Sequence, residues 1–197
     1  MIKKVSLLIL TLTALTFAQA EVAPKFEIKD INSKATTIIA KKNGLDIPSA
    51  KGKIVFIEFW GTHCPPCVYS IPHYIELTKK YKDKLVMFAV ESQGSSKEAL
   101  AAYGKSKGIN YNLYTQRENI DFVKYLAQRA GWRGSIPFLV ILDTTGDVVD
   151  IKTGMVSSEY LEGVVNYILK KQAKVTVIQD NNTTKESNST KENNRTK

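Results

Sequence analysis

Cysteine and histidine are both scarce in this 197-residue sequence, which holds two of each. A structural zinc site needs four ligands. If a helix runs from Cys67, it places His73 roughly 9 Å further along, so the two cysteines, His63 and His73 do not close around one ion. A bridge between Cys64 and Cys67 would close almost no loop and would gain little chain entropy. The scarcity therefore argues against both a zinc-centred fold and a fold stapled by disulfides.

Long apolar runs are also missing beyond residue 20. Residues 1–20 begin with Lys3 and Lys4, continue through a 14-residue apolar run and end on Ala18-Gln19-Ala20. This is the pattern of a secretory signal, and the run is shorter than the roughly 20 apolar residues that span a bilayer. We predict cleavage after Ala20 and a periplasmic protein, with an uncleaved anchor as the alternative.

The sequence carries a net charge of +9, which falls to +7 when the two lysines of residues 1–20 are removed. Its lysines and arginines are scattered among acidic residues and are not gathered in one basic patch. A scattered basic charge indicates a solvated surface, so we expect no nucleic-acid partner.

Residues 179–197 contain no aliphatic or aromatic side chain. A segment that cannot bury apolar surface cannot offset its ordering entropy, so a disordered polar tail is expected there. Residues 21–178 then form one domain, which is long enough for a single substantial core.

The tail repeats one short pattern around Asn182, Asn188 and Asn194. Each of these asparagines has an acidic residue two positions before it and Ser or Thr two positions after it. This pattern resembles the extended acceptor sequon of bacterial N-glycosylation, which predicts glycans on the tail in a host with that pathway.

Short apolar runs alternate with helical patterns along the predicted domain. The runs at 54–60, 85–90 and 137–142 are nearly continuous, as expected of central strands covered on both faces. A turn at 143–147 pairs the third run with 148–151, and 26–29 with 37–40 is a further candidate hairpin. Helical patterns follow the cysteines and recur at 95–107, 119–129 and 157–171. The pattern predicts an α/β fold.

The two cysteines stand at the end of the first central strand and the start of a helix, in the sequence Cys64-Pro65-Pro66-Cys67. Backbone N–H groups and the helix dipole at such a position favour a thiolate, which is the form that attacks a disulfide. We predict that Cys64 is the exposed nucleophile and that the shielded Cys67 resolves the mixed disulfide. Pro65 and Pro66 lack N–H groups and stiffen the loop.

The stretch FWGTHCPPCVYSIP, after the apolar strand KIVFIEF, resembles the active-site segment of the thioredoxin superfamily, with Pro72 five residues after the second cysteine. The stretch GSIP, followed by FLVIL and DTTGDVV, resembles the cis-proline strand of that superfamily. The resemblance covers residues 26–171 and is strongest for the exported TlpA/ResA-like branch. It implies a thioredoxin fold, with a central mixed β-sheet flanked by helices, an N-terminal β-hairpin and a helical insertion.

By this resemblance the protein would be a monomeric thiol-disulfide oxidoreductase that needs no metal or organic cofactor. Its clients would be exported proteins, apocytochrome c among them, and a membrane electron donor would recharge it. Pro137 would be cis and would lie against the disulfide. The substrate surface would comprise Trp60, His63, Pro65, Pro66 and Ile136.

Glu58 interrupts an otherwise apolar strand. It either faces solvent at a sheet edge or is buried, in which case desolvation raises its pKa. By the same resemblance, a buried Glu58 would lie beneath Cys67 and pass protons to and from it.

Two functions other than disulfide reduction fit the same residues. The same chemistry could serve an oxidase or isomerase, although the absence of a histidine between the cysteines and the presence of Ile136 before Pro137 favour a reductase. Alternatively, Cys64, Cys67 and His63 could hold Cu(I) in a carrier. Copper carriers of related fold generally add a distant histidine, and this sequence has none beyond His73.

Overall fold

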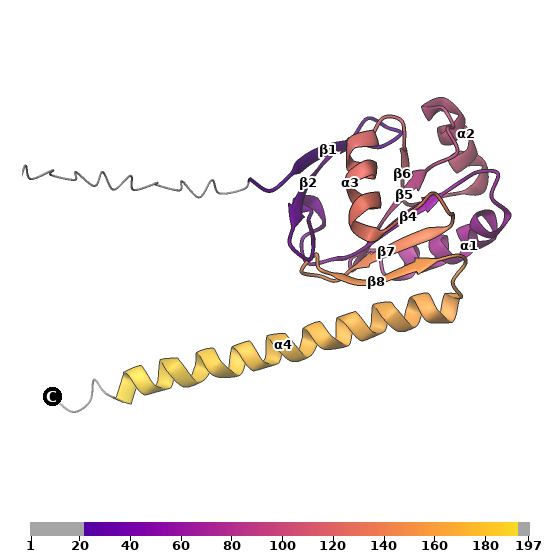
Figure 1. Cartoon of the computed structure of the whole chain (residues 1–197). Helices are drawn as coiled ribbons and strands as arrows, with labels where there is room; N and C mark the ends of the chain where they lie inside the picture. Colours follow the sequence, from indigo (N-terminus) through magenta and orange to yellow (C-terminus); the bar gives the residue numbers. More distant parts are fainter. Residues whose placement is uncertain (1–21, 193–197) are drawn as a thin grey trace, which may run out of the picture.

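The computed structural model describes the backbone of residues 22–192 and the side chains of residues 22–175 (Figure 1). The predicted signal, residues 1–20, lies outside the described residues. In chain order the elements are β1 (Lys25–Lys29), β2 (Ala35–Lys41), β3 (Gly44–Asp46), the short 3-10 helix η1 (Pro48–Ala50), β4 (Ile54–Trp60), α1 (Pro65–Lys80), β5 (Leu85–Glu91), α2 (Lys97–Lys107), β6 (Asn112–Thr115), α3 (Ile120–Ala130), β7 (Phe138–Leu142), β8 (Val148–Thr153) and α4 (Ser158–Glu192).

A five-stranded mixed sheet of order β6-β5-β4-β7-β8 forms the centre of the fold. The central strand β4 pairs parallel with β5 and antiparallel with β7, and all seven of its residues are buried. Strands β7 and β8 form the predicted antiparallel hairpin. Figure 1 shows α3 on one side of this sheet and α4 on the other. The predicted mixed sheet flanked by helices is therefore confirmed.

Alternation along β4 divides the apolar side chains between two cores. Ile54 and Phe56 point to one face and belong to a cluster here called the α1 core, which also holds residues of α1, α2 and α4 and both cysteines. Val55, Ile57 and Phe59 point to the other face and belong to the α3 core, which α3 and the N-terminal strands complete. Alternation is expected because successive side chains of a strand point to opposite faces.

The N-terminal hairpin is confirmed as β1 paired antiparallel with β2, and a third short strand, β3, extends it. Asn119, at the N-cap of α3, ties this sheet to the domain. Its Oδ1 accepts from the Lys29 N–H at 2.8 Å, and its Nδ2 donates to the Lys29 carbonyl at 3.1 Å. The N-terminal sheet is therefore part of the α3 core and is not a separate unit.

The predicted helical insertion contains a strand that the sequence reading missed. Between α2 and α3, β6 adds to the edge of the central sheet, parallel to β5. Only its last three residues, Leu113, Tyr114 and Thr115, are buried. Four residues are too few to show a reliable periodicity, so tertiary pairing rather than local pattern defines this strand.

The C-terminal segment differs from the expected disordered tail. The backbone of α4 continues as helix to Glu192, past Lys171 where the last helix was expected to end and past residue 179 where disorder was expected to begin. No glycine or proline follows Gly163, so no residue interrupts the helix. Asn182 and Asn188 lie within α4, whereas Asn194 lies outside the described residues. Within residues 22–192, no helix is both long and apolar enough to cross a membrane.

Candidate redox site

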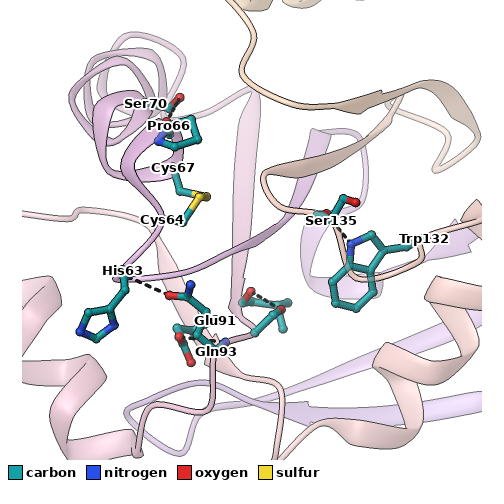
Figure 2. Close-up of a disulfide and its surroundings, with 11 residues drawn as sticks. His63, Cys64, Pro66, Cys67, Ser70, Glu91, Gln93, Trp132 and Ser135 are labelled. Atoms are coloured by element: carbon teal, nitrogen blue, oxygen red, sulfur yellow. Dashed lines mark hydrogen bonds between the residues drawn. A yellow bond between two sulfur atoms is a disulfide. The ribbon is translucent and has the colours of Figure 1, made fainter.

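The two cysteines form a disulfide at the N-terminus of α1, with their Cα atoms 5.2 Å apart (Figure 2). Cys64 is the N-cap, in an extended conformation, and Pro65 and Pro66 are the first two helical residues. Proline suits these positions because the first N–H groups of a helix have no partner in the helix. The sequence therefore begins the helix at the cysteine pair, as predicted.

The two prolines reduce the number of N–H groups that can face the Cys64 sulfur. Neither carries an N–H, and the Val68 N–H donates to the Cys64 carbonyl at 3.0 Å. Cys67 is consequently the only residue between Cys64 and Val68 with a backbone N–H. A Cys64 thiolate here has fewer backbone donors than at a helix that begins without proline.

Cys64 is less exposed than expected. It is 6% exposed and Cys67 is 2% exposed, so both belong to the α1 core in the disulfide state. The expectation of an exposed Cys64 was wrong for the disulfide state, because apolar neighbours pack around the bridge. The order of exposure, with Cys64 above Cys67, is the order predicted for the two residues.

The Ile136–Pro137 peptide bond is cis, as the resemblance implied. Ile136 packs against the cluster that contains both cysteines, and the Gly154 N–H donates to the Pro137 carbonyl at 2.8 Å. The loop before them is held by Trp132, whose indole N–H donates to the Ser135 carbonyl at 2.7 Å. The Trp132 ring stacks on Phe59, with centroids 4.2 Å apart and planes at 6°. Figure 2 shows Trp132 and Ser135 with this bond.

Glu58 is buried, so the alternative that it faces solvent at a sheet edge is wrong. It is 3% exposed and lies in the central strand, where alternation directs it to the same face as Phe56 and Trp60 in the α1 core. Desolvation raises the pKa of its carboxyl from 4.5 to about 8, and a hydrogen bond from Tyr74 partly opposes this rise. Among the described residues, its Oε1 has no hydrogen-bond partner. The carboxyl can therefore exchange a proton near neutral pH.

Comparison with known proteins places these features in a family. The Redoxin family matches residues 19–169, which is most of the chain. The chain belongs to the Redoxin family.

Relatives of this Redoxin chain include named thiol-disulfide oxidoreductases. A thiol-disulfide oxidoreductase ResA from Bacillus subtilis is 28% identical over 148 residues, covering 74% of this chain and 73% of the relative. The thioredoxin-like protein YneN from the same organism is 29% identical over 146 residues, covering 73% and 76%. A thioredoxin-family thiol:disulfide interchange protein from Chlorobium tepidum has the same fold, with a TM-score of 0.59, 23% identity and coverage of 75% and 94%. The thioredoxin fold is therefore confirmed.

The residues expected to contact substrate divide into two groups in the Redoxin chain. His63, Pro65 and Pro66 are exposed beside Cys64, and Ile136 is half-buried. Trp60, by contrast, is 2% exposed and packs near Tyr103, with ring centroids 5.9 Å apart. Trp60 therefore supports the site from below and presents no surface to a substrate.

The site also includes two residues that the sequence reading missed. Tyr74, on α1, supplies the hydrogen bond to Glu58, and no local signal distinguishes it from the other apolar residues of that helix. Tyr69 is 63% exposed and lines an open surface hollow beside the disulfide with Thr62, His63, Pro65 and Val68. Within the described part of the chain, no group of three or more His, Cys, Asp or Glu side chains is placed to hold a metal ion.

Proposed function

We propose that this protein reduces disulfides in exported proteins through Cys64 and Cys67. The coarser conclusion, that it is a thiol-disulfide oxidoreductase, follows from its family, its relatives and its fold. The observation that carries the proposal is the Cys64–Cys67 disulfide at the start of α1. Ile136, which precedes the cis bond to Pro137, packs against the cluster that contains both cysteines, and Glu58 lies on the strand face that looks into this cluster.

In the proposed reaction the reduced protein transfers two electrons to a client. The Cys64 thiolate attacks one sulfur of the client disulfide, that S–S bond breaks, and the released client thiolate takes up a proton. Cys67 then loses its proton and attacks Cys64 in the mixed disulfide. This second step releases the other client thiol and leaves the Cys64–Cys67 disulfide. A reductant on the exported side must then restore the two thiols.

We propose Glu58 as the group that accepts the Cys67 proton in the second step. Its carboxyl lies on the face of β4 that looks into the core containing Cys67. With a pKa raised to about 8 by burial, it is a proton acceptor of strength suited to a thiol, because catalytic groups work best with a pKa near the working pH.

Three features support a reductase over an oxidase. Pro65 and Pro66 remove backbone donors that would stabilise a Cys64 thiolate, and Ile136 offers no side-chain hydrogen bond. Glu58, on the strand face that looks into the core of the pair, disfavours negative charge on the sulfurs once it ionises, at its raised pKa of about 8. Strong oxidants depend on the opposite condition, a stabilised thiolate in the reduced form.

We expect the Cys64 pKa to lie near thioredoxin's roughly 7 and not near the roughly 3.5 of a strong oxidant. Thiolate absorbance titrates Cys64, and equilibrium with glutathione gives the potential. A suitable client is an oxidised peptide with the C-x-x-C-H haem attachment sequence, which the reduced protein should convert to the dithiol. A Cys64 pKa below about 5 together with a potential near −120 mV would contradict a reductase.

The clients and the location are part of the proposal. We propose a periplasmic protein that acts on apocytochrome c and is recharged by a membrane electron donor. His63, Pro65, Pro66 and Ile136 would contact the client, and the buried Pro137 would lie against the disulfide. The exposure of the first three beside Cys64 supports this assignment. The copper-carrier alternative predicts stoichiometric copper in the reduced protein and no reduction of the peptide.

We also propose glycans on Asn182, Asn188 and Asn194. The three sites share one acceptor pattern and lie in the polar C-terminal segment. The mature protein, purified from its native host, should exceed its sequence mass by one to three glycans, and replacing all three asparagines with glutamine should remove the excess. An unmodified mass in a host with the pathway would contradict this proposal.

A further inference from the structure

The loop that follows β5 reaches across to the residue before Cys64. Glu91 ends β5 and is fully buried, at 0% exposure. Its carboxylate accepts from two backbone N–H groups of the following loop, Gln93 at 3.0 Å and Ser95 at 2.9 Å. A buried carboxylate requires such partners, so the loop is fixed to the end of the strand.

The fixed loop directs the Gln93 side chain to the backbone of His63, the residue before Cys64. Gln93 Oε1 accepts from the backbone N–H of His63 at 2.8 Å, as Figure 2 shows. Gly61 leaves the room for this side chain, since a Cβ at Gly61 would lie 2.2 Å from Gln93 Oε1 and 2.3 Å from its Cδ. We call the contact from Glu91 through Gln93 to His63 the Gln93 bridge.

We propose that Gln93 is a positioning residue of the redox site, which acts by holding the backbone of His63 and Cys64. Cys64 has few other constraints on its N-terminal side. The Cys64 N–H bonds to the Gly61 carbonyl at 3.3 Å, which is long. Among residues 22–175, the His63 ring has one hydrogen-bond partner, the half-buried Thr62 next to it. The proposal rests on the proposed thiol-disulfide chemistry and deepens it.

The bridge acts on the disulfide through the effective concentration of the two thiols. Cys67 is fixed within α1, whereas the place of Cys64 depends on the loop that precedes it. A looser loop brings the Cys64 thiol near Cys67 less often, and this disfavours the disulfide relative to the dithiol. Loss of the bridge should therefore make the pair easier to reduce.

Gln93→Met tests this, because methionine keeps the side-chain length and removes the acceptor. In the nitrogen-labelled oxidised protein, the His63 amide should exchange with solvent faster in Q93M than in the parent. The equilibrium with glutathione should shift towards the dithiol by roughly 3- to 10-fold, the effect of one hydrogen bond. At 29.6 mV for each tenfold change, this is about 15 to 30 mV.

Two further variants make the result specific. Gln93→Glu keeps an acceptor for the His63 N–H. At about pH 6, where the thiols are protonated, Q93E should therefore show the parent's rate of His63 amide exchange and the parent's equilibrium with glutathione. Gln128→Met changes an exposed glutamine on α3 and should alter neither the His63 amide exchange nor the equilibrium with glutathione. Q128M should unfold at the parent's temperature, because Gln128 is exposed, whereas Q93M should lose more stability as the disulfide than as the dithiol, by the free energy that corresponds to the shift in the equilibrium.

Either of two results would overturn the proposal. Unchanged His63 exchange in Q93M would show that the bridge does not hold the loop. Faster exchange with an unchanged equilibrium would show that the loop does not position Cys64. The proposed function fails differently, through a parent protein that reduces no client disulfide, and that outcome leaves the Q93M comparison intact.

Discussion

Replacement of Cys67 by alanine is expected to leave the protein covalently attached to its clients. Cys64 can still attack a client disulfide, but no second thiol remains to release the mixed disulfide. Replacement of Cys64 by alanine removes the attacking sulfur, and reduction of a disulfide peptide should fall by about a thousandfold or more. Non-reducing electrophoresis of the proteins expressed in the exporting host measures the trapped complexes.

The comparison between the two variants decides the roles of the cysteines. Cys64 is the more exposed of the pair and caps the helix, whereas Cys67 lies inside the first turn. The double variant should trap nothing and serves as the control. Equal trapping by the two single variants would show that either sulfur can attack, contrary to the assignment.

Replacement of Glu58 by glutamine is expected to stabilise the oxidised protein strongly at alkaline pH. Glutamine keeps the shape and an acceptor for Tyr74 but carries no charge to bury. Each pKa unit corresponds to about 1.4 kcal/mol. The rise of the Glu58 pKa from 4.5 to about 8 therefore lowers the free energy of unfolding by up to about 5 kcal/mol at high pH.

The sign of the pH dependence follows from proton binding. Between pH 4.5 and about 8 the folded protein keeps the Glu58 proton that the unfolded chain releases, so folding becomes less favourable as pH rises through this window. The parent should lose stability across it, and E58Q should not show this loss. Denaturant unfolding at about pH 4, 7 and 9 measures the difference, which should be small at the lowest pH and a few kcal/mol at the highest.

A control variant and a rate measurement separate the effect of Glu58 on stability from its proposed role in proton transfer. Glu76→Gln changes an exposed glutamate of α1, the helix that carries Tyr74, and should leave the pH dependence of stability as in the parent. If Glu58 also takes the Cys67 proton, E58Q should slow release of the mixed disulfide. A parallel pH dependence of stability in E58Q and the parent would contradict a buried carboxyl with a raised pKa.

The sequence was most informative where a local pattern has one physical solution. Nearly continuous apolar runs identified β4, β5 and β7, because only strands covered on both faces need such runs. The cysteine pair and its prolines marked the start of α1, and the resemblance supplied the cis bond before Pro137. These elements contain most of the candidate site.

The sequence was least informative where long-range contacts decide the structure. Strand β6 is defined by pairing with β5, and Tyr74 becomes part of the site only because α1 packs over β4. Gln93 is a polar residue in a loop, and nothing near it in the sequence indicates that it meets His63, 30 positions away. The polar composition beyond residue 178 predicts disorder, whereas α4 continues to Glu192 through a segment without glycine or proline.

Ile136 is the residue at which the two cores of the domain meet, since it packs against both the α1 core and the α3 core. It also precedes Pro137 and adjoins the cluster that holds the sulfurs. Stability and redox potential are therefore not independent properties of this protein. A cavity opened next to Ile136 in either layer is expected to loosen the packing of the cluster that holds the sulfurs, and with it to alter the balance between disulfide and dithiol.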